Sequence, residues 1–409
     1  MHDLVIRTQR RVSRLFREWV PHNLHQRPTG VHYSSRELAA QPGSGVAYQE
    51  VVPAYTSELR IPPEFYALAS EYAGLHDKPH PTEDIPPAFV VTLTNGRLYA
   101  DNFDSVAIIT ADNQLVGDAS FQYSSREWNL TPPEHNNIFQ QRYFEEPRDI
   151  AGTVCSLLSG GGAASGNYYH WLIDSLPRLH LVREAGLLDA VDYFVVYDAR
   201  KQFVLDTLAA LGIGPERLLD VRTTPHLRAR QLLATSAVRG RLTHTPAWAC
   251  TFLRGALLPP PPVQRTFSPL VYISRRDAPG RHILNEPELE AMLQEYGFET
   301  HVLTPYSQAE KIALFAQARV VVASVGAGLA NLVVSPPGAQ LIELFPPSFV
   351  VADYLEFTSR LGIGYQFLVG TSPHVSTGRL NAQRDDLHVD PAALRALVET
   401  ALHRQAALT

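Results

Sequence analysis

The sequence predicts an α/β protein made of two doubly wound domains. Over most of its 409 residues, short apolar runs typical of strands alternate with segments whose apolar residues recur at helical spacing. This alternation is typical of βαβ units with parallel strands. A four-proline run, Pro259–Pro262, is stiff and can join neither a helix nor a sheet interior, so we expect it to link the two domains.

The expected elements follow from these patterns. Residues 1–85 are irregular and predict an N-terminal helix and an extended wrap, and 124–150 are expected to be loop. Asn95-Gly96, between two apolar runs, predicts a hairpin. Expected strands are 88–93, 97–100, 105–109, 193–196, 218–221, 231–235, 270–273, 300–303, 320–323, 341–344 and 365–369, and expected helices follow the glycine loop near 160 and span 202–211, 247–258, 286–296, 307–318, 351–361 and 391–408.

The expected domain boundaries follow from the same patterns. An N-terminal domain at 86–258 follows the wrap, and the linker occupies 259–264. A second domain covers 265–375, and the C-terminal helix in 376–409 could pack back on the N-terminal domain. A hydrophobic content of 45% is enough for two cores.

Composition excludes several classes of function. A net charge of -6 argues against nucleic acid as the main partner. Two cysteines that lie far apart, Cys155 and Cys250, exclude a cysteine zinc site and fit a reducing, cytoplasmic compartment. No segment approaches the ~20 apolar residues that span a bilayer. The arginine-rich, amphipathic residues 1–20 could contact a membrane surface, and the alternative is a helix packed on its own protein.

A glycine-rich loop followed by a helix, residues 159–179, is the first candidate for chemistry. His170 and Asp174 are four apart and can form a hydrogen bond that fixes the imidazole tautomer, and either could act as a general base. The alternative is an ordinary ion pair between Asp174 and Arg178. Pro177 predicts a kink. The polar stripe of this helix contains Asn167, His170, Asp174 and Arg178.

The second candidate is an arginine-rich loop after the strand at 270–273. Arg275, Arg276 and Arg281 follow the carboxyl end of that strand, where charged, bidentate donors suit a diphosphate. The alternative is surface arginines that pair with Asp277 and with glutamates of the next helix.

The third candidate is a strand, a small-residue turn and a short helix at 319–331. Backbone N–H groups of Gly326, Ala327 and Gly328 at the start of a helix can bind an anion, although glycines also occur there for close packing alone. Glu343 ends the next strand, where such sheets place a carboxylate for a sugar hydroxyl. No metal-binding motif occurs, so no metal is expected.

In their order and spacing these three segments together resemble glycosyltransferase family 61, over about residues 153–350. One position departs from the family: many members have a histidine directly before the glycines, and this chain has Val325. The matching residues are Asn167, His170, Asp174, Pro177-Arg178, Ser274-Arg275-Arg276, Arg281, Asn285-Glu286, Gly326-Ala327-Gly328-Leu329, Asn331, Pro337-Gly338 and Glu343.

The resemblance implies a GT-B fold of two facing Rossmann-like domains and an inverting, metal-independent hexosyl- or pentosyltransferase of capsular-polysaccharide type. The expected donor is a nucleotide sugar, UDP-linked, and the expected acceptor is a glycan or glycolipid bound by the N-terminal domain. Asp174, preferred over His170, would be the base. Asn167, the three arginines, residues 326–328, Asn331 and Glu343 would bind the donor. Two alternatives remain: a nucleotide-sugar epimerase or hydrolase, and a non-catalytic carbohydrate-binding or assembly protein.

Overall fold

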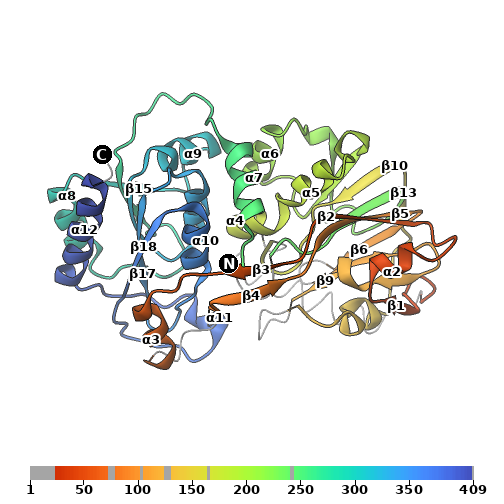
Figure 1. Ribbon diagram of the computed structural model, residues 1–409, viewed down its shortest axis with the longest axis horizontal. Helices are drawn as coiled ribbons and strands as arrows, with labels where there is room; N and C mark the ends of the chain where they lie inside the picture. Colours follow the sequence, from red (N-terminus) through yellow and green to blue (C-terminus); the bar gives the residue numbers. More distant parts are fainter. Residues whose placement is uncertain are drawn as a thin grey trace. The chain divides into compact units, whose positions relative to one another are not determined.

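The chain folds into two compact units, which the computed structural model shows as an α/β architecture (Figure 1). The first unit contains Met1–Pro53, Pro87–Leu205 and Ile213–Ala237, and the second contains the remaining segments. The predicted helix within residues 1–20 lies outside the described residues. The structure describes residues 24–71, 79–101, 105–123, 130–163, 166–239 and 244–407.

The first unit is built on one large mixed sheet, which has 11 strands within the described residues. Of its described pairings, those of β13–β10–β11–β12 and of β1 with β8 are parallel and the others are antiparallel, so the expectation of parallel strands holds for only part of this unit. Its strands are β1 (Gly30–His32), β2 (Val46–Val52), β5 (Ala88–Thr94), β6 (Arg97–Asp101), β7 (Ser105–Ile109), β8 (Gln114–Val116), β9 (Phe121–Gln122), β10 (Arg148–Ser156), β11 (Tyr193–Val196), β12 (Leu218–Asp220) and β13 (His226–Thr235).

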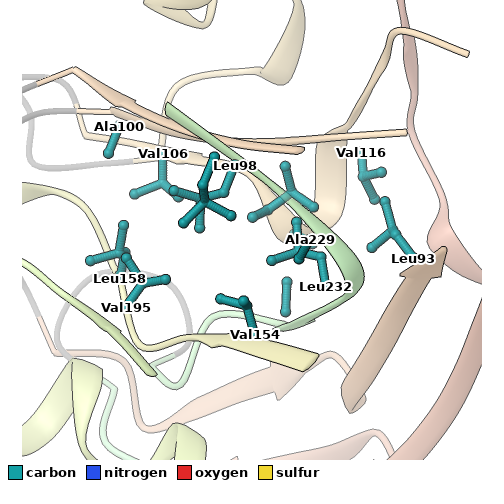
Figure 2. Packing of buried hydrophobic residues seen from close by; sticks show 14 of the residues in the cluster. Leu93, Leu98, Ala100, Val106, Val116, Val154, Leu158, Val195, Ala229 and Leu232 are labelled. Atoms are coloured by element: carbon teal, nitrogen blue, oxygen red, sulfur yellow. The ribbon is translucent and has the colours of Figure 1, made fainter. Parts of the chain in front are cut away.

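The core of this unit lies against that sheet. Figure 2 shows buried aliphatic side chains from several strands converging into one interior, among them Leu93, Leu98, Val154 and Leu232. Helix α5 packs against β5 and β13. The helices here are α2 (Ser35–Ala39), α4 (Tyr168–His170), a π-helical turn η5 (Trp171–Ser175), α5 (Arg178–Glu184) and α6 (Gln202–Ala209), which crosses the boundary between the units.

The predicted hairpin at Asn95-Gly96 is wrong. β5 and β6 do not pair with each other, because both lie antiparallel along β13, where Thr94 faces Gln231 and Arg97 faces Arg228. Asn95 has a φ of 53°, so the two residues bend the chain between β5 and β6 instead of reversing its direction.

The second unit is a parallel five-stranded sheet of order β15-β14-β16-β17-β18, with helices on both faces. Figure 1 shows α8 and α12 on one side of this sheet and α9 and α10 on the other. Its sheet strands are β14 (Leu270–Ser274), β15 (Glu299–Val302), β16 (Val320–Ser324), β17 (Gln340–Phe345) and β18 (Gly364–Val369), and its longer helices are α7 (Ala247–Leu257), α8 (Glu286–Glu295), α9 (Gln308–Gln317), η8 (Ala327–Val334), α10 (Asp353–Leu361) and α12 (Pro391–Ala406).

Two segments lie differently from the expected domain plan. Part of the expected wrap, residues 54–86, belongs to the second unit, where Phe65 packs edge-on against Phe367 of β18. This part holds the antiparallel pair of β3 (Tyr55–Glu58) and β4 (Thr82–Ile85), and helix α3 (Pro63–Glu71) lies between them in sequence. The C-terminal helix α12 packs on the second unit's own sheet, because Leu394 and Val398 share a core with Ile342.

The strand order of the second unit fixes where a ligand is expected. The chain passes from β14 to β15 on one side and then to β16 on the other, so the order reverses between β14 and β16. In open α/β sheets, ligands bind at the carboxyl ends of the strands beside such a switch point. Here these ends lead directly into Arg275 and Gly326. The GT-B arrangement of two domains stays a prediction.

Candidate functional site

A short helix places His170 against Asp174. It begins at Tyr168, because the Asn167 side chain accepts a hydrogen bond from the Tyr169 N–H at 2.9 Å. The distance between His170 Nδ1 and Asp174 Oδ2 is 2.7 Å. The Asp174 side chain is 8% exposed and that of His170 is 27% exposed. The pair therefore presents its imidazole outward and keeps its carboxylate inward.

A π-helical turn lies directly after this helix, where a kink was expected. The Leu176 N–H donates to the Trp171 carbonyl at 2.9 Å, a bond that spans five residues. Pro177 has no N–H, so it cannot continue the helical ladder. Arg178 Nε donates instead to the Asp174 carbonyl at 3.0 Å. Arg178 is thus buried and bonded to the Asp174 backbone, and the alternative of an ordinary ion pair with the Asp174 carboxylate is wrong. Single π-turns are frequent at functional sites.

The glycine loop lies against the imidazole. A Cβ added to Gly162 would be 2.0 Å from His170 Cδ2 and 2.3 Å from Nε2. The Gly160 N–H donates to the Tyr197 hydroxyl at 2.6 Å, which anchors the start of the loop. Gly162 is therefore required for close approach of the backbone to the ring.

In the second unit, Arg275 lies across the turn that follows β16. A Cβ on Gly326 would be 1.9 Å from Arg275 Nη1. The φ of Gly326 is 175°, which any residue adopts, so the glycine is needed for space. Arg275 donates from Nε and Nη2 to the Gly280 carbonyl at 3.3 and 3.2 Å. The guanidinium is held beside the first turn of η8, whose N–H groups have no intrahelical acceptor.

Arg281 is the second cation near this turn, and we call the group of Arg275, Arg281 and Gly326 the cationic site. Its backbone has a φ of 59°, and its guanidinium lies 5.2 Å from the centre of the Phe349 ring. Nη1 donates to the Gln383 carbonyl at 2.8 Å, while Nε is buried without a hydrogen-bond partner. Burial, and then the charge of Arg275, lower the pKa of Arg281 to about 9. Burial also lowers the pKa of Arg275.

Arg276 points elsewhere, although it lies next to Arg275 in sequence. Its side chain is 50% exposed, pairs with Glu290 and lies 3.6 Å from Glu286 of α8. The alternative expectation, in which the arginine pairs at the surface with glutamates of the next helix, is therefore confirmed for Arg276.

Glu343 is fully buried at the end of β17. Tyr365 donates a hydrogen bond to Oε2 at 2.8 Å, and Oε1 has no hydrogen-bond partner. Burial raises the pKa of Glu343 well above its usual value, and Arg281 acts in the opposite direction. The carboxyl group lies near the two arginines. Its charge acts on Arg281 and on Tyr354, and both arginines in turn act on Tyr354.

Two tyrosines complete this site and were missed from the sequence. Tyr354 donates to the Gly326 carbonyl at 2.7 Å and so fixes the turn, while Tyr365 orients Glu343. Neither residue follows a strand or belongs to a motif, so no local signal indicates its role. Asn331 is also structural in its visible contact, because it donates to the Gly328 carbonyl at 2.8 Å.

The predicted residues thus form two groups, one in each unit. Asn167, His170 and Asp174 lie together in the first unit, and Arg275, Arg281, Gly326–Gly328 and Glu343 lie together in the second. Within the described residues, no three His, Cys, Asp or Glu side chains gather as metal ligands would. In the same part of the chain, no helix is both long and apolar enough to cross a membrane.

Comparison with known proteins bears on both groups. No curated protein matches the chain. The family model described as Glycosyltransferase 61 matches residues 168–342, a segment that contains His170 and Asp174, the arginine loop and the glycine turn. The match supports glycosyltransferase family 61 for this part of the chain, and with it a glycosyltransferase activity.

Proposed function

We propose that this protein is an inverting, metal-independent glycosyltransferase that moves a sugar from a nucleotide-sugar donor, UDP-linked, to a hydroxyl group of a glycan or glycolipid. The acceptor would belong to a cell-surface polysaccharide built from the cytoplasmic side. The observation that supports this most directly is the pair of partly buried arginines, Arg275 and Arg281, beside Gly326 at the switch point of a parallel sheet.

The electrostatics of this pair favour a bound anion. The hydrogen bonds of both guanidinium groups go to backbone carbonyls, those of Gly280 and Gln383, and neither forms an ion pair with a described carboxylate. Two neighbouring, partly buried cations repel each other and have lost part of their hydration, so an anion that bridges them recovers much of that cost. A diphosphate has the charge and the planar oxygen pairs that guanidinium groups bind bidentately.

The same groups would assist the chemical step. When the donor's anomeric bond breaks, negative charge grows on the leaving diphosphate, and fixed cations at that place stabilise it without reorganisation. Arg275, Arg281 and the N–H groups of η8 would do what a divalent metal does in other transferases.

The geometry favours His170 as the base, with Asp174 as its orienting partner, which reverses the preference drawn from the sequence. Nδ1 of the imidazole is bonded to the buried carboxylate, so Nε2 keeps its lone pair and can accept the proton of a hydroxyl. Asp174 is the less exposed of the two and stabilises the imidazolium that forms.

A panel of nucleotide sugars tests the proposal. We expect one donor to raise the melting temperature, because a ligand at 100 times its Kd adds ~2.7 kcal/mol of stability. Consumption of that donor only when a glycan acceptor is present supports transfer. Equal consumption without acceptor would indicate an epimerase or hydrolase, and no binding of any donor would indicate a non-catalytic protein.

Two variants separate the roles of the acid–base pair. His170→Asn should lower transfer by at least ~100-fold, the usual contribution of a general base, and leave donor binding unchanged. Asp174→Asn should lower transfer less, because the imidazole remains. Greater loss in Asp174→Asn than in His170→Asn would show that the carboxylate is the base.

A further inference from the structure

Arg178 is a buried cation for which the proposed chemistry has so far assigned no task. It is 2% exposed and is the bulkiest of the described side chains that are fully buried. Nε donates to the Asp174 carbonyl at 3.0 Å, and Nη1 donates to Oγ1 of Thr235 at 2.9 Å. Its guanidinium carbon lies 4.7 Å from the centre of the Phe121 ring. Within the described residues, its hydrogen-bond partners are all neutral groups.

The groups that face this cation come from several elements. Burial lowers the pKa of Arg178, while Tyr123, Tyr197, Asp174 and Cys155 act in the opposite direction. Of these, Asp174 has the carboxylate, and Arg178 reaches it through space and through the backbone of the same π-turn. A buried cation without a contacting counter-ion is costly. It therefore stabilises most strongly the negative charge of its nearest ionisable neighbour.

The geometry of the turn shows how Arg178 acts. In η5 the Leu176 N–H donates to the Trp171 carbonyl, and the carbonyl of Asp174 receives the side-chain donor of Arg178. That donor and the bonds to Thr235 join the turn to the end of β13. The direction of the Asp174 side chain depends on this backbone.

We propose that Arg178 is a positioning residue, which fixes the π-turn that aims Asp174 at His170 and places a positive charge beside that pair. The proposal rests on the proposed function, in which this pair accepts the acceptor's proton. It predicts a charge effect and a geometric effect, which different substitutions separate.

The charge effect has a defined direction. Arg178→Met removes a positive charge near the pair, so the pair holds its proton more tightly and its titration midpoint rises. Arg178→Lys keeps the charge, so the midpoint stays. Lysine cannot donate along both fork directions at once, so the turn loosens and the imidazole samples both tautomers.

The test is an NMR titration of the full chain with ¹³C,¹⁵N-labelled histidine, in which His170→Asn assigns the His170 signals. We expect one tautomer in the native chain, a higher midpoint in Arg178→Met and mixed tautomers in Arg178→Lys. Arg97→Met is the matched control, because Arg97 is a buried arginine of the same unit that contacts His226. It should shift the His226 signals and leave those of His170 unchanged.

An unchanged His170 midpoint in folded Arg178→Met, or an equal His170 shift in Arg97→Met, would overturn the proposal. If Arg178→Met does not fold, Arg178→Lys and Thr235→Val test the proposal. Both keep the positive charge and weaken the hydrogen bonds that residue 178 forms with Asp174 and Thr235. Native tautomer populations in both would then refute the positioning role. The NMR titration needs no substrate, so its result does not depend on whether the proposed transfer activity is found.

Discussion

The substitution Gly326→Ala addresses the contact on which the cationic site depends. The added Cβ would lie 1.9 Å from Arg275 Nη1, and ordinary contact begins near 3.4 Å, so the guanidinium must retreat by about 1.5 Å. The backbone imposes no strain, because φ is 175°. The nearest obstacle is the end of a flexible side chain, so the fold should survive and the arginine should move.

The cost can be estimated from the bonds that are lost. The displaced guanidinium gives up bonds to the Gly280 carbonyl at 3.2 and 3.3 Å, which should lower stability by about 1 kcal/mol. A misplaced charge-assisted contact to a phosphate costs about 2–3 kcal/mol, or about 30- to 150-fold in Kd.

Calorimetric titration with UDP, and with GDP as a second probe, measures this effect. Gly255→Ala is the matched control, because nothing lies within 4 Å of a Cβ added there in α7. Binding of either nucleotide by Gly326→Ala with the affinity of the native chain would refute the role of Arg275 in the site.

Three further predictions concern the loop, the buried acid and the sheet. Gly162→Ala should displace the His170 ring, and we expect transfer to fall at least tenfold in steady-state assays with little change in donor KM. Glu343 holds its proton in the folded state above the usual pKa of 4.5, so its contribution to stability is full below 4.5 and is lost as pH rises toward the folded-state pKa. Glu343→Gln should therefore gain stability relative to the native chain as the pH rises above 4.5 in urea unfolding. Gly96→Ala should cost about 2 kcal/mol in the same assay, because its Cβ would be 2.9 Å from that of Leu232.

Each of these has an outcome that contradicts it. Normal transfer by Gly162→Ala would show that catalysis does not depend on the position of the His170 ring. A stability difference between Glu343→Gln and the native chain that does not vary with pH would mean that Glu343 ionises normally. Full stability of Gly96→Ala would contradict the close packing of the bend against β13.

The parallel sheet of the second unit was predictable because its central strands are buried on both faces. Such strands are continuous apolar runs, as in β16 and β17, where every residue is buried. β10 was missed because it begins with Arg148-Asp149 and contains Gly152. Its position beside β13 depends on pairing that no local pattern reports.

The arginine loop shows where sequence reasoning about the site ends. Arg275 and Arg276 are chemically alike and adjacent, and the pattern assigned both to the donor. The structure separates them through residues distant in sequence, because Gly326 leaves space for one and Glu290 of α8 binds the other. The π-turn likewise depends on Arg178 reaching β13, which spacing alone does not indicate.

The most direct test of the central claim is a titration of UDP in the presence of EDTA against Arg281→Gln and Arg276→Gln. Arg281 is partly buried and forms no ion pair with a described carboxylate, whereas Arg276 is half exposed and paired with α8. We predict that the native chain and Arg276→Gln bind UDP without a metal, and that Arg281→Gln binds at least tenfold more weakly. Equal weakening by both substitutions, or binding only when a divalent metal is added, would contradict the account.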